Sequence, residues 1–334
     1  MIDLNKLYDT LNSRNNFILT THVNPDADAI GSVVGMGIIL SRLNKKFRIV
    51  NYSHTPYYLE FLDPEKWIEV YDPEKHKTAF SDAENIICLD FNRVDRTAKM
   101  QHLLRESHAY KICIDHHTNP DTEFFDEIFF DIEHAATGHI LFNLTEEFPE
   151  IGMDYNLALP LYAAIMTDTG SFRFERTTPE IHRIAAKCLE LGVVPIEVQE
   201  KIYDSNKPGK IKLLGEVIDS MEIIHNGELV IMQITKDALE RNQVEENGTD
   251  GFINLGLSII GVKMVLLFHE VKEGFKVSLR SRGNVYVNEF AGKYGGGGHK
   301  YASGIRIRDA KLEDYKEDII SEAILHLEKS KDND

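Results

Sequence analysis

Ionisable side chains that can bind metal ions follow several apolar runs of this chain. A histidine and two aspartates follow the first run, single aspartates follow two others, and an Asp-His-His triplet follows a fourth. The first segment alone is equally explained by helix capping, because an aspartate there can accept hydrogen bonds from the free amides that begin a helix. Together, however, the segments predict one shared site. Its candidate residues are His22, Asp26, Asp28, Asp90, Asp115, His116, His117 and Asp168.

Several carboxylates in one place require a compensating positive charge. Like charges raise one another's pKa and destabilise a fold unless cations neutralise them. Aspartate and histidine ligands without cysteine favour Mn²⁺, Mg²⁺ or a similar ion over a structural zinc site. We therefore expect a divalent metal site.

The elements that position these residues alternate between strands and helices. Continuous apolar runs such as Ile86–Leu89 are typical of parallel strands that are buried on both faces. They predict an α/β fold with a doubly wound, mainly parallel sheet, in which ligands gather at the carboxyl ends of the strands. The predicted strands are 17–21, 47–52, 85–90 and 110–115, and the predicted later helices are 138–148, 157–166 and 180–191.

The remaining chain predicts a second, smaller α/β domain. Strand patterns return at 229–234, 262–269, 274–280 and 305–307, followed by a charged amphipathic helix at 312–327. A length of 334 residues also favours two domains at about 100–200 residues each. We expect a catalytic metal-binding domain at 1–192, a connector at 193–222 and a substrate-binding domain at 223–328.

A local excess of positive charge marks part of the second domain. Lys276–Arg308 contains seven Lys or Arg residues and a single acid, Glu289, although the whole chain carries a formal charge of −17. The segment also contains four consecutive glycines, Gly295–Gly298, and glycine lets backbone amides approach an anion closely. A flexible loop beside a solvated basic face is the alternative interpretation.

The metal-binding residues resemble the motifs of the DHH phosphoesterases in type, order and spacing. The resemblance implies two divalent ions, with Mn²⁺ as the first choice and Mg²⁺ or Co²⁺ as alternatives. It assigns His22, Asp26, Asp90 and Asp168 to one ion and Asp28, Asp90, His116 and Asp168 to the other. It also implies that Asp115 holds a ligand histidine and that His117 contacts the scissile phosphate.

The second domain resembles the DHH-associated substrate domain of the nanoRNase and pAp-phosphatase branch. The resemblance extends to Ala135–Gly138 and Asp168–Phe174, while Tyr301 departs from the asparagine common in that branch. It implies that a substrate phosphate or terminal nucleotide is held by Arg280, Ser281, Gly297, Gly298 and His299.

The resemblance implies hydrolysis of short oligoribonucleotides and dinucleotides such as pApA to 5′-mononucleotides, and of the nucleoside bisphosphate 3′-phosphoadenosine 5′-phosphate to AMP. The alternatives are a cyclic-dinucleotide phosphodiesterase, a RecJ-type single-strand exonuclease and a nucleotide sensor without turnover. Pyrophosphatase or exopolyphosphatase activity is disfavoured because relatives with that activity carry a different C-terminal domain.

Composition limits the partners. A charge of −17 opposes binding to long duplex nucleic acid, whose affinity depends on neutralising many phosphates. The N-terminus has no signal-peptide pattern, and no apolar run is long enough to span a bilayer. We expect a cytoplasmic protein without a membrane partner, for which a homodimer is one compatible assembly. Cys88, Cys113 and Cys188 form no Cys-x-x-Cys pair and are expected as buried thiols.

Overall fold

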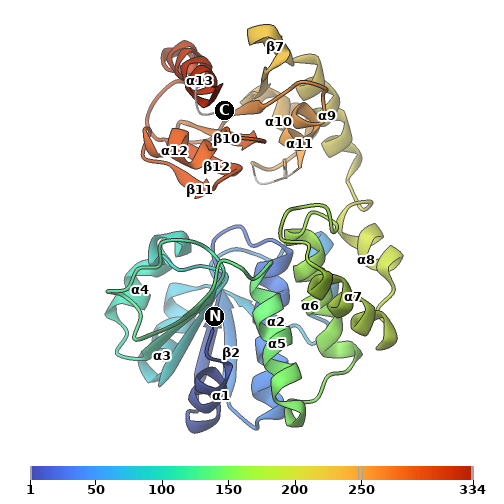
Figure 1. The fold of residues 1–334 in the computed structure, drawn as a ribbon. Coiled ribbons are helices and arrows are strands. Elements are labelled where there is room, and N and C mark those ends of the chain that lie inside the picture. The colour runs from blue at the N-terminus through green and yellow to red at the C-terminus, as the bar shows by residue number, and fades with distance from the viewer. Residues whose placement is uncertain (1, 247, 250, 332–334) are drawn as a thin grey trace. The chain divides into compact units, whose positions relative to one another are not determined.

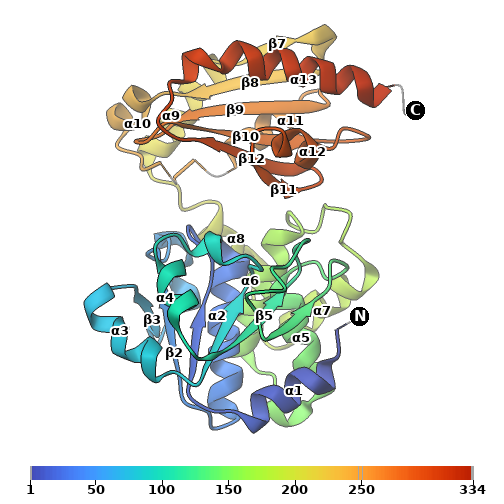
Figure 2. The ribbon, with the colours of Figure 1, turned by 90° about the vertical axis from the view of Figure 1, so that its left-hand side faces the viewer.

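A computed structural model describes residues 2–246, 248–249 and 251–331. The chain forms two compact units, Met1–Ser205 and Asn206–Asp334, which are shown in Figures 1 and 2. The division between them lies inside the expected connector. That connector contains two helices, α8 (Pro195–Ile202) in the first unit and α9 (Pro208–Asp219) in the second. Among the described residues, no helix combines the length and apolar character needed to cross a membrane.

The first unit is built on a parallel sheet of six strands in the order β3-β2-β1-β4-β5-β6. This sheet confirms the predicted fold class. The strands are β1 (Phe17–Thr20), β2 (Phe47–Asn51), β3 (Ile68–Val70), β4 (Asn85–Leu89), β5 (Tyr110–Asp115) and β6 (Glu127–Phe130).

Side chains of the central strands supply two separate cores. In β4, Ile87 and Leu89 pack on one face of the sheet, whereas Ile86 and Cys88 pack on the other. This alternation is the normal geometry of a strand, and burial of both faces requires helices on both sides. One face is covered by α1 (Leu4–Ser13), α2 (Ala27–Arg42), α5 (Thr137–Glu147), α6 (Tyr155–Asp168) and α7 (Pro179–Glu190), and the other by α3 (Pro73–Asp82) and α4 (Met100–Glu106).

The second unit contains a mixed sheet of six strands in the order β11-β12-β10-β9-β8-β7. Strands β8 and β9 are parallel, and the other pairs are antiparallel. The strands are β7 (Glu222–Ile224), β8 (Leu229–Ile234), β9 (Met264–Glu270), β10 (Phe275–Ser281), β11 (Gly297–His299) and β12 (Ala302–Ile307).

Helices cover both faces of this second sheet. Helices α12 (Val287–Gly292) and α13 (Lys316–Lys331) pack on one face, as Figure 2 shows for α13. The other face carries α9 with α10 (Lys236–Asn242) and α11 (Phe252–Leu257). The expected charged helix at 312–327 begins instead with a short 3₁₀ turn at Leu312–Asp314, and the α-helix itself runs from Lys316 to Lys331.

Candidate metal centre

The metal-binding side chains lie at the carboxyl ends of three adjacent strands. His22 follows β1, Asp90 directly follows β4, and His116 directly follows β5, and these strands are neighbours in the order β1-β4-β5. Helices supply the remaining aspartates. Asp26 caps the start of α2, Asp28 lies in the first turn of α2, and Asp168 ends α6.

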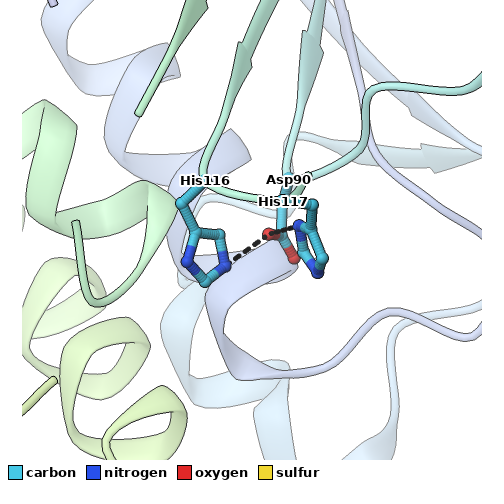
Figure 3. Close-up of side chains that lie close together, drawn as sticks. All are labelled: Asp90, His116 and His117. Atoms are coloured by element: carbon cyan, nitrogen blue, oxygen red, sulfur yellow. Dashed lines mark ion pairs between the residues drawn. The ribbon is translucent and has the colours of Figure 1, made fainter. Parts of the chain in front are cut away.

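Asp90 lies between two of the histidines. One carboxylate oxygen, Oδ2, is 3.2 Å from Nε2 of His22, and the other, Oδ1, is 3.5 Å from Nε2 of His116. Figure 3 shows Asp90 with His116 and with His117, whose Nδ1 is 3.7 Å from Oδ1. Asp90 is 2% exposed and has a φ of 63°, a left-handed conformation that is costly outside glycine and is common at functional sites.

Two histidines are oriented by backbone carbonyl groups. Nδ1 of His22 is 3.0 Å from the Val23 carbonyl oxygen, and Nδ1 of His116 is 3.2 Å from the His134 carbonyl oxygen. A hydrogen bond from Nδ1 to a carbonyl fixes the tautomer in which Nε2 can bind a metal ion. At His22 this contact leaves Nε2 as a potential ligand atom directed at the carboxylates. At His116, Nδ1 also lies 3.1 Å from Nη1 of Arg176, and Nε2 again faces the carboxylates.

The carboxylates and imidazoles that could bind metal ions form two groups around Asp90. The atoms of His22, Asp26 and Asp90 that could bind a metal ion lie within 4.8 Å of one another, as do those of Asp28, His116 and Asp168. Nε2 of His116 is 3.1 Å from Oδ2 of Asp168 and 3.7 Å from Oδ2 of Asp28. The structure thus brings together all six residues that were predicted as metal ligands.

Asp28 is held by the start of helix α5. Its Oδ2 accepts a hydrogen bond from the Thr137 amide at 2.7 Å, and its Oδ1 accepts one from the Gly138 amide at 2.9 Å and one from the Ser32 hydroxyl at 3.0 Å. Ala136, the residue before α5, has no capping side chain. The carboxylate of Asp28 therefore caps α5 from another helix, and the positive end of the helix dipole stabilises its charge.

Thr137 connects two of the carboxylates. While its amide donates to Asp28, its hydroxyl donates to Oδ1 of Asp90 at 3.2 Å. A side chain at Gly138 would place a Cβ 2.6 Å from the Cβ of Ala164, so only glycine lets α5 approach this closely. Sequence reasoning missed both roles. The signal in the sequence is the Ala-Ala-Thr-Gly segment at Ala135–Gly138, whose family resemblance assigns no role to Thr137 or Gly138.

Burial perturbs the titration of the carboxylates. Burial, together with the negative charges of Asp90 and Asp168, raises the pKa of Asp28 well above its usual range. The surrounding protein and the charge of Asp90 raise the pKa of Asp26 to about 6, even though part of its side chain reaches solvent. Burial opposes ionisation of Asp90 too, but hydrogen bonds with His116 and His22 bring its pKa well below the ordinary value.

The Asp115 carboxylate contacts a different histidine from the one expected. Its Oδ1 is 2.7 Å from Nδ1 of His117, although the sequence comparison implied that it holds a ligand histidine. The reason is that His116 turns towards Asp168 and uses the His134 carbonyl. Asp115 is fully buried, while the His117 side chain is 21% exposed. This pair fixes the His117 tautomer with the proton on Nδ1.

In the second unit, most predicted substrate-binding residues lie on the two strands that flank β12. Arg280 in β10 and His299 in β11 both pair with Ala302 of the intervening β12. Gly297 and Gly298 belong to β11, so part of the glycine run is a strand rather than a flexible loop. At Gly298, φ is 141°, and a Cβ would lie 2.6 Å from the Ala302 carbonyl oxygen.

Ser281 does not join this group. It is 4% exposed, and its hydroxyl donates to the Val285 carbonyl at 2.6 Å. Consecutive residues of a strand face opposite sides of the sheet, so Ser281 faces the side opposite its neighbour Arg280. The expectation that both residues face one ligand does not match this arrangement.

The donor set fits divalent cations. It consists of four carboxylates and two imidazoles, which suit Mn²⁺, Mg²⁺ and similar ions. No lysine or arginine forms an ion pair with these carboxylates among the described residues. A cation would remove the repulsion that raises the pKa of Asp26 and Asp28.

Comparison with known proteins identifies the family. The DHH family N-terminal domain matches residues 16–165, and the DHHA1 domain matches residues 226–327. A bifunctional oligoribonuclease and PAP phosphatase NrnA of Thermus thermophilus is 32% identical over 305 residues, which cover 90% of this chain and 87% of that protein. The chain belongs to the DHH family of phosphoesterases.

Other relatives agree with this membership. The protein of Bacillus subtilis with the same name is 29% identical over 303 residues, which cover 90% of this chain and 90% of that protein. The crystal structure of an exopolyphosphatase-related protein from Bacteroides fragilis superposes with a TM-score of 0.86 at 28% identity, covering 96% of this chain and 95% of that one. The DHH phosphoesterase therefore shares both its domains, in the same order, with these relatives.

Proposed function

We propose that this DHH phosphoesterase binds two divalent metal ions and hydrolyses short oligoribonucleotides and 3′-phosphoadenosine 5′-phosphate. The observation that carries the proposal is the position of Asp90, whose two carboxylate oxygens face two different histidines. A carboxylate that presents one oxygen to each of two ligand groups is suited to bridging two ions.

The ligand sets follow from the two groups around Asp90. We assign His22, Asp26 and Asp90 to the first ion, and Asp28, His116 and Asp90 to the second. Asp168, which is 3.1 Å from His116, is assigned as a second bridging ligand. Mn²⁺ is the proposed ion, because oxygen and imidazole ligands in a mixed set suit it well, and metal analysis of the purified protein would distinguish it from Mg²⁺ and Co²⁺.

Two bound ions would activate water for attack on phosphorus and polarise the phosphoryl oxygens. The protein itself would supply the proton for the leaving oxygen. Asp115 holds Nδ1 of His117 at 2.7 Å, so a protonated His117 can donate only from Nε2. Such a donor is useful because an alkoxide is a poor leaving group. The buried Asp115 charge would also stabilise the imidazolium before the transfer.

The second unit is proposed to bind the nucleotide portion of the substrate. Arg280, His299 and the glycine amides of β11 are neighbours across β12, and guanidinium and amide groups together suit a phosphate. The substrate class is inferred from the relatives, two of which are named bifunctional oligoribonuclease and PAP phosphatase. Their similarity covers both units, which supports carrying over the substrate class.

A panel of substrates tests the proposal. Purified protein is incubated with Mn²⁺ and with pApA, 3′-phosphoadenosine 5′-phosphate, a cyclic dinucleotide or pyrophosphate, and products are separated by chromatography. We expect AMP from the first two substrates, little turnover of the other two, and complete loss of activity with EDTA. Faster hydrolysis of pyrophosphate or of the cyclic dinucleotide would overturn the substrate assignment. Binding of pApA without turnover would instead support a sensor.

A further inference from the structure

A strained turn directly follows the metal centre. Gly170, Ser171 and Phe172 come after α6 and all have a positive φ, of 59°, 58° and 62°. Positive φ is uncommon outside glycine and is an outlier for a bulky residue such as phenylalanine. Strained backbone of this kind clusters at active sites and ligand-binding sites. Here it begins two residues after Asp168, a proposed metal ligand.

Hydrogen bonds and packing hold this turn in one conformation. The amides of Arg173 and Phe174 both donate to the Thr169 carbonyl, at 2.8 and 3.0 Å. The Phe172 ring packs against Tyr162, with 6.0 Å between ring centroids. The turn is therefore anchored to helix α6, which also carries Asp168.

Phe174 follows the turn and is exposed. It is 55% exposed, and its ring lies against Gly170, where an added Cβ would be 2.4 Å from a ring atom. Glycine at position 170 is thus required both by the backbone conformation and by the ring. The turn therefore holds a large exposed aromatic ring in a fixed position close in the chain to Asp168.

A second aromatic side chain lies at the same turn. Tyr203 ends helix α8 and is 38% exposed. Its phenol shares a hydrogen bond with the side chain of Ser171, the second residue of the strained turn. Tyr203 is therefore joined to the strained turn, which begins two residues after Asp168.

We propose that Phe174 and Tyr203 form a stacking platform for a nucleobase of the substrate whose phosphate is held at the metal centre. This inference rests on the proposed function and adds to it a base-binding subsite on the first unit. Exposed aromatic rings beside a cationic side chain are the means by which proteins bind single-stranded nucleic acid without reading its sequence. Arg173, which is exposed and lies beside Phe174 in the chain, supplies that cation.

The platform makes a prediction about specificity. Every base has an aromatic face, so stacking tolerates all four bases. No hydrogen-bond donor or acceptor is needed from the rings themselves. The enzyme should therefore cleave short RNAs of mixed sequence, with purines favoured over pyrimidines at the stacked position because their rings are larger.

The test compares pApA with two analogues, each of which lacks one adenine base. Affinities are measured in Mg²⁺ with versions whose scissile oxygen is replaced by a methylene group, and stacking is read from 2-aminopurine fluorescence. F174A should weaken binding of pApA by roughly 5- to 150-fold, or about 1–3 kcal/mol, and Y203A should act in the same direction. F174W, which keeps an aromatic face, should restore binding.

One analogue provides the decisive comparison. The analogue that lacks the stacked base should bind wild type and F174A equally, whereas the other analogue should still distinguish them. Y155A is the matched control, because Tyr155 is 44% exposed and begins α6, at the end of that helix opposite Asp168. An unchanged affinity of F174A for pApA, or an equal loss on both analogues, would overturn the platform.

The design separates the two proposals. If wild-type protein hydrolyses none of the nucleotides in Mn²⁺, the proposed function fails, while fluorescence quenching still reports whether a base stacks on Phe174. If wild type hydrolyses pApA and F174A does so with unchanged KM, the platform alone fails. A raised KM with a nearly unchanged kcat is the result expected for a residue that binds the base and takes no part in the chemical step.

Discussion

The hydroxyl of Thr137 offers a sharp test of how the metal centre is held together. Replacing Thr137 with valine exchanges the hydroxyl for a methyl group of similar size. The variant keeps the amide that donates to Asp28 at 2.7 Å and loses only the hydroxyl that donates to Asp90 at 3.2 Å. Valine is also β-branched, so the side chain should keep its orientation at the start of α5.

The size of the effect follows from the burial of the acceptor. Asp90 is 2% exposed, and a hydrogen bond to a charged group is worth about 1.5–3 kcal/mol, which corresponds to roughly a 10- to 150-fold change in an equilibrium constant. Loss of groups that orient metal ligands typically costs about 10- to 100-fold in metal affinity. We therefore expect T137V to bind at least one Mn²⁺ ion about 10- to 100-fold more weakly, and T137S to restore the affinity.

Isothermal titration of Mn²⁺ into EDTA-stripped protein measures this affinity directly. T145V is the matched control, because Thr145 is also buried in α5 and its hydroxyl donates to the Phe142 carbonyl at 2.8 Å, within the helix. T145V should retain the wild-type Mn²⁺ affinity. If T137V binds two ions as tightly as wild type, the hydroxyl does not position Asp90 and the reasoning is refuted.

Three further predictions concern chemistry, pH and substrate length. D90N should abolish hydrolysis in saturating Mn²⁺ while circular dichroism shows a retained fold, and near-normal turnover would exclude a bridging role. Burial and the nearby Lys276 lower the pKa of His269 to about 4, so the neutral ring contributes stability that is complete above pH ~6.5 and is lost as pH falls towards 4. Urea unfolding should therefore show that the free energy of unfolding decreases by up to about 3 kcal/mol over this pH range, and that the decrease is smaller in H269Q. Parallel pH profiles of wild type and H269Q would contradict a role of His269. Cleavage of 5′-labelled RNA should decline beyond about five nucleotides, because the chain outside the basic segment repels a longer polyanion over roughly 10 Å at 0.1 M salt, whereas faster cleavage of a 24-mer than of a dimer would favour a processive exonuclease.

The central strands were the part of the fold that could be predicted from the sequence. The predicted strands 110–115 and 229–234 match β5 and β8 residue for residue, and 85–90 exceeds β4 by one residue. Short apolar runs within them, such as Ile112–Ile114 and Leu229–Met232, are typical of buried strands. By contrast, β3 has only half-buried residues, and β11 consists of Gly-Gly-His. Such strands are determined by their neighbours in the sheet, which a local pattern does not contain.

The candidate site shows the same division between local and distant information. The spacing of Asp26 and Asp28, and the apolar runs before Asp90 and His116, are local features, and they led to a group of side chains that the structure brings together. The contact from Thr137 to Asp28 spans 109 residues, and no periodicity or spacing indicates it. The partner of Asp115 was also missed, because the choice between two adjacent histidines depends on which one meets Asp168.

Without a bound cation, the protein stabilises the negative charges of the four carboxylates of the site to different extents. Asp28 accepts three hydrogen bonds, two of them from the start of α5, and Asp90 contacts two imidazoles. Asp26 accepts from the Ala29 amide as the cap of α2. The fourth, Asp168, is instead the last residue of α6, where the negative end of the helix dipole opposes a negative charge.

Asp168 therefore has the most to gain from a bound cation. Its one close contact to a basic group among the described ion pairs is with His116, at 3.1 Å, and a histidine that binds a metal ion must be neutral. A bound metal ion would thus remove the positive charge of a protonated His116 from the side of Asp168 and replace it with the larger charge of a divalent cation. The strained turn at 170–172 begins two residues later, so the carboxylate with the most to gain from a metal ion lies next in the chain to the turn that carries the proposed base platform.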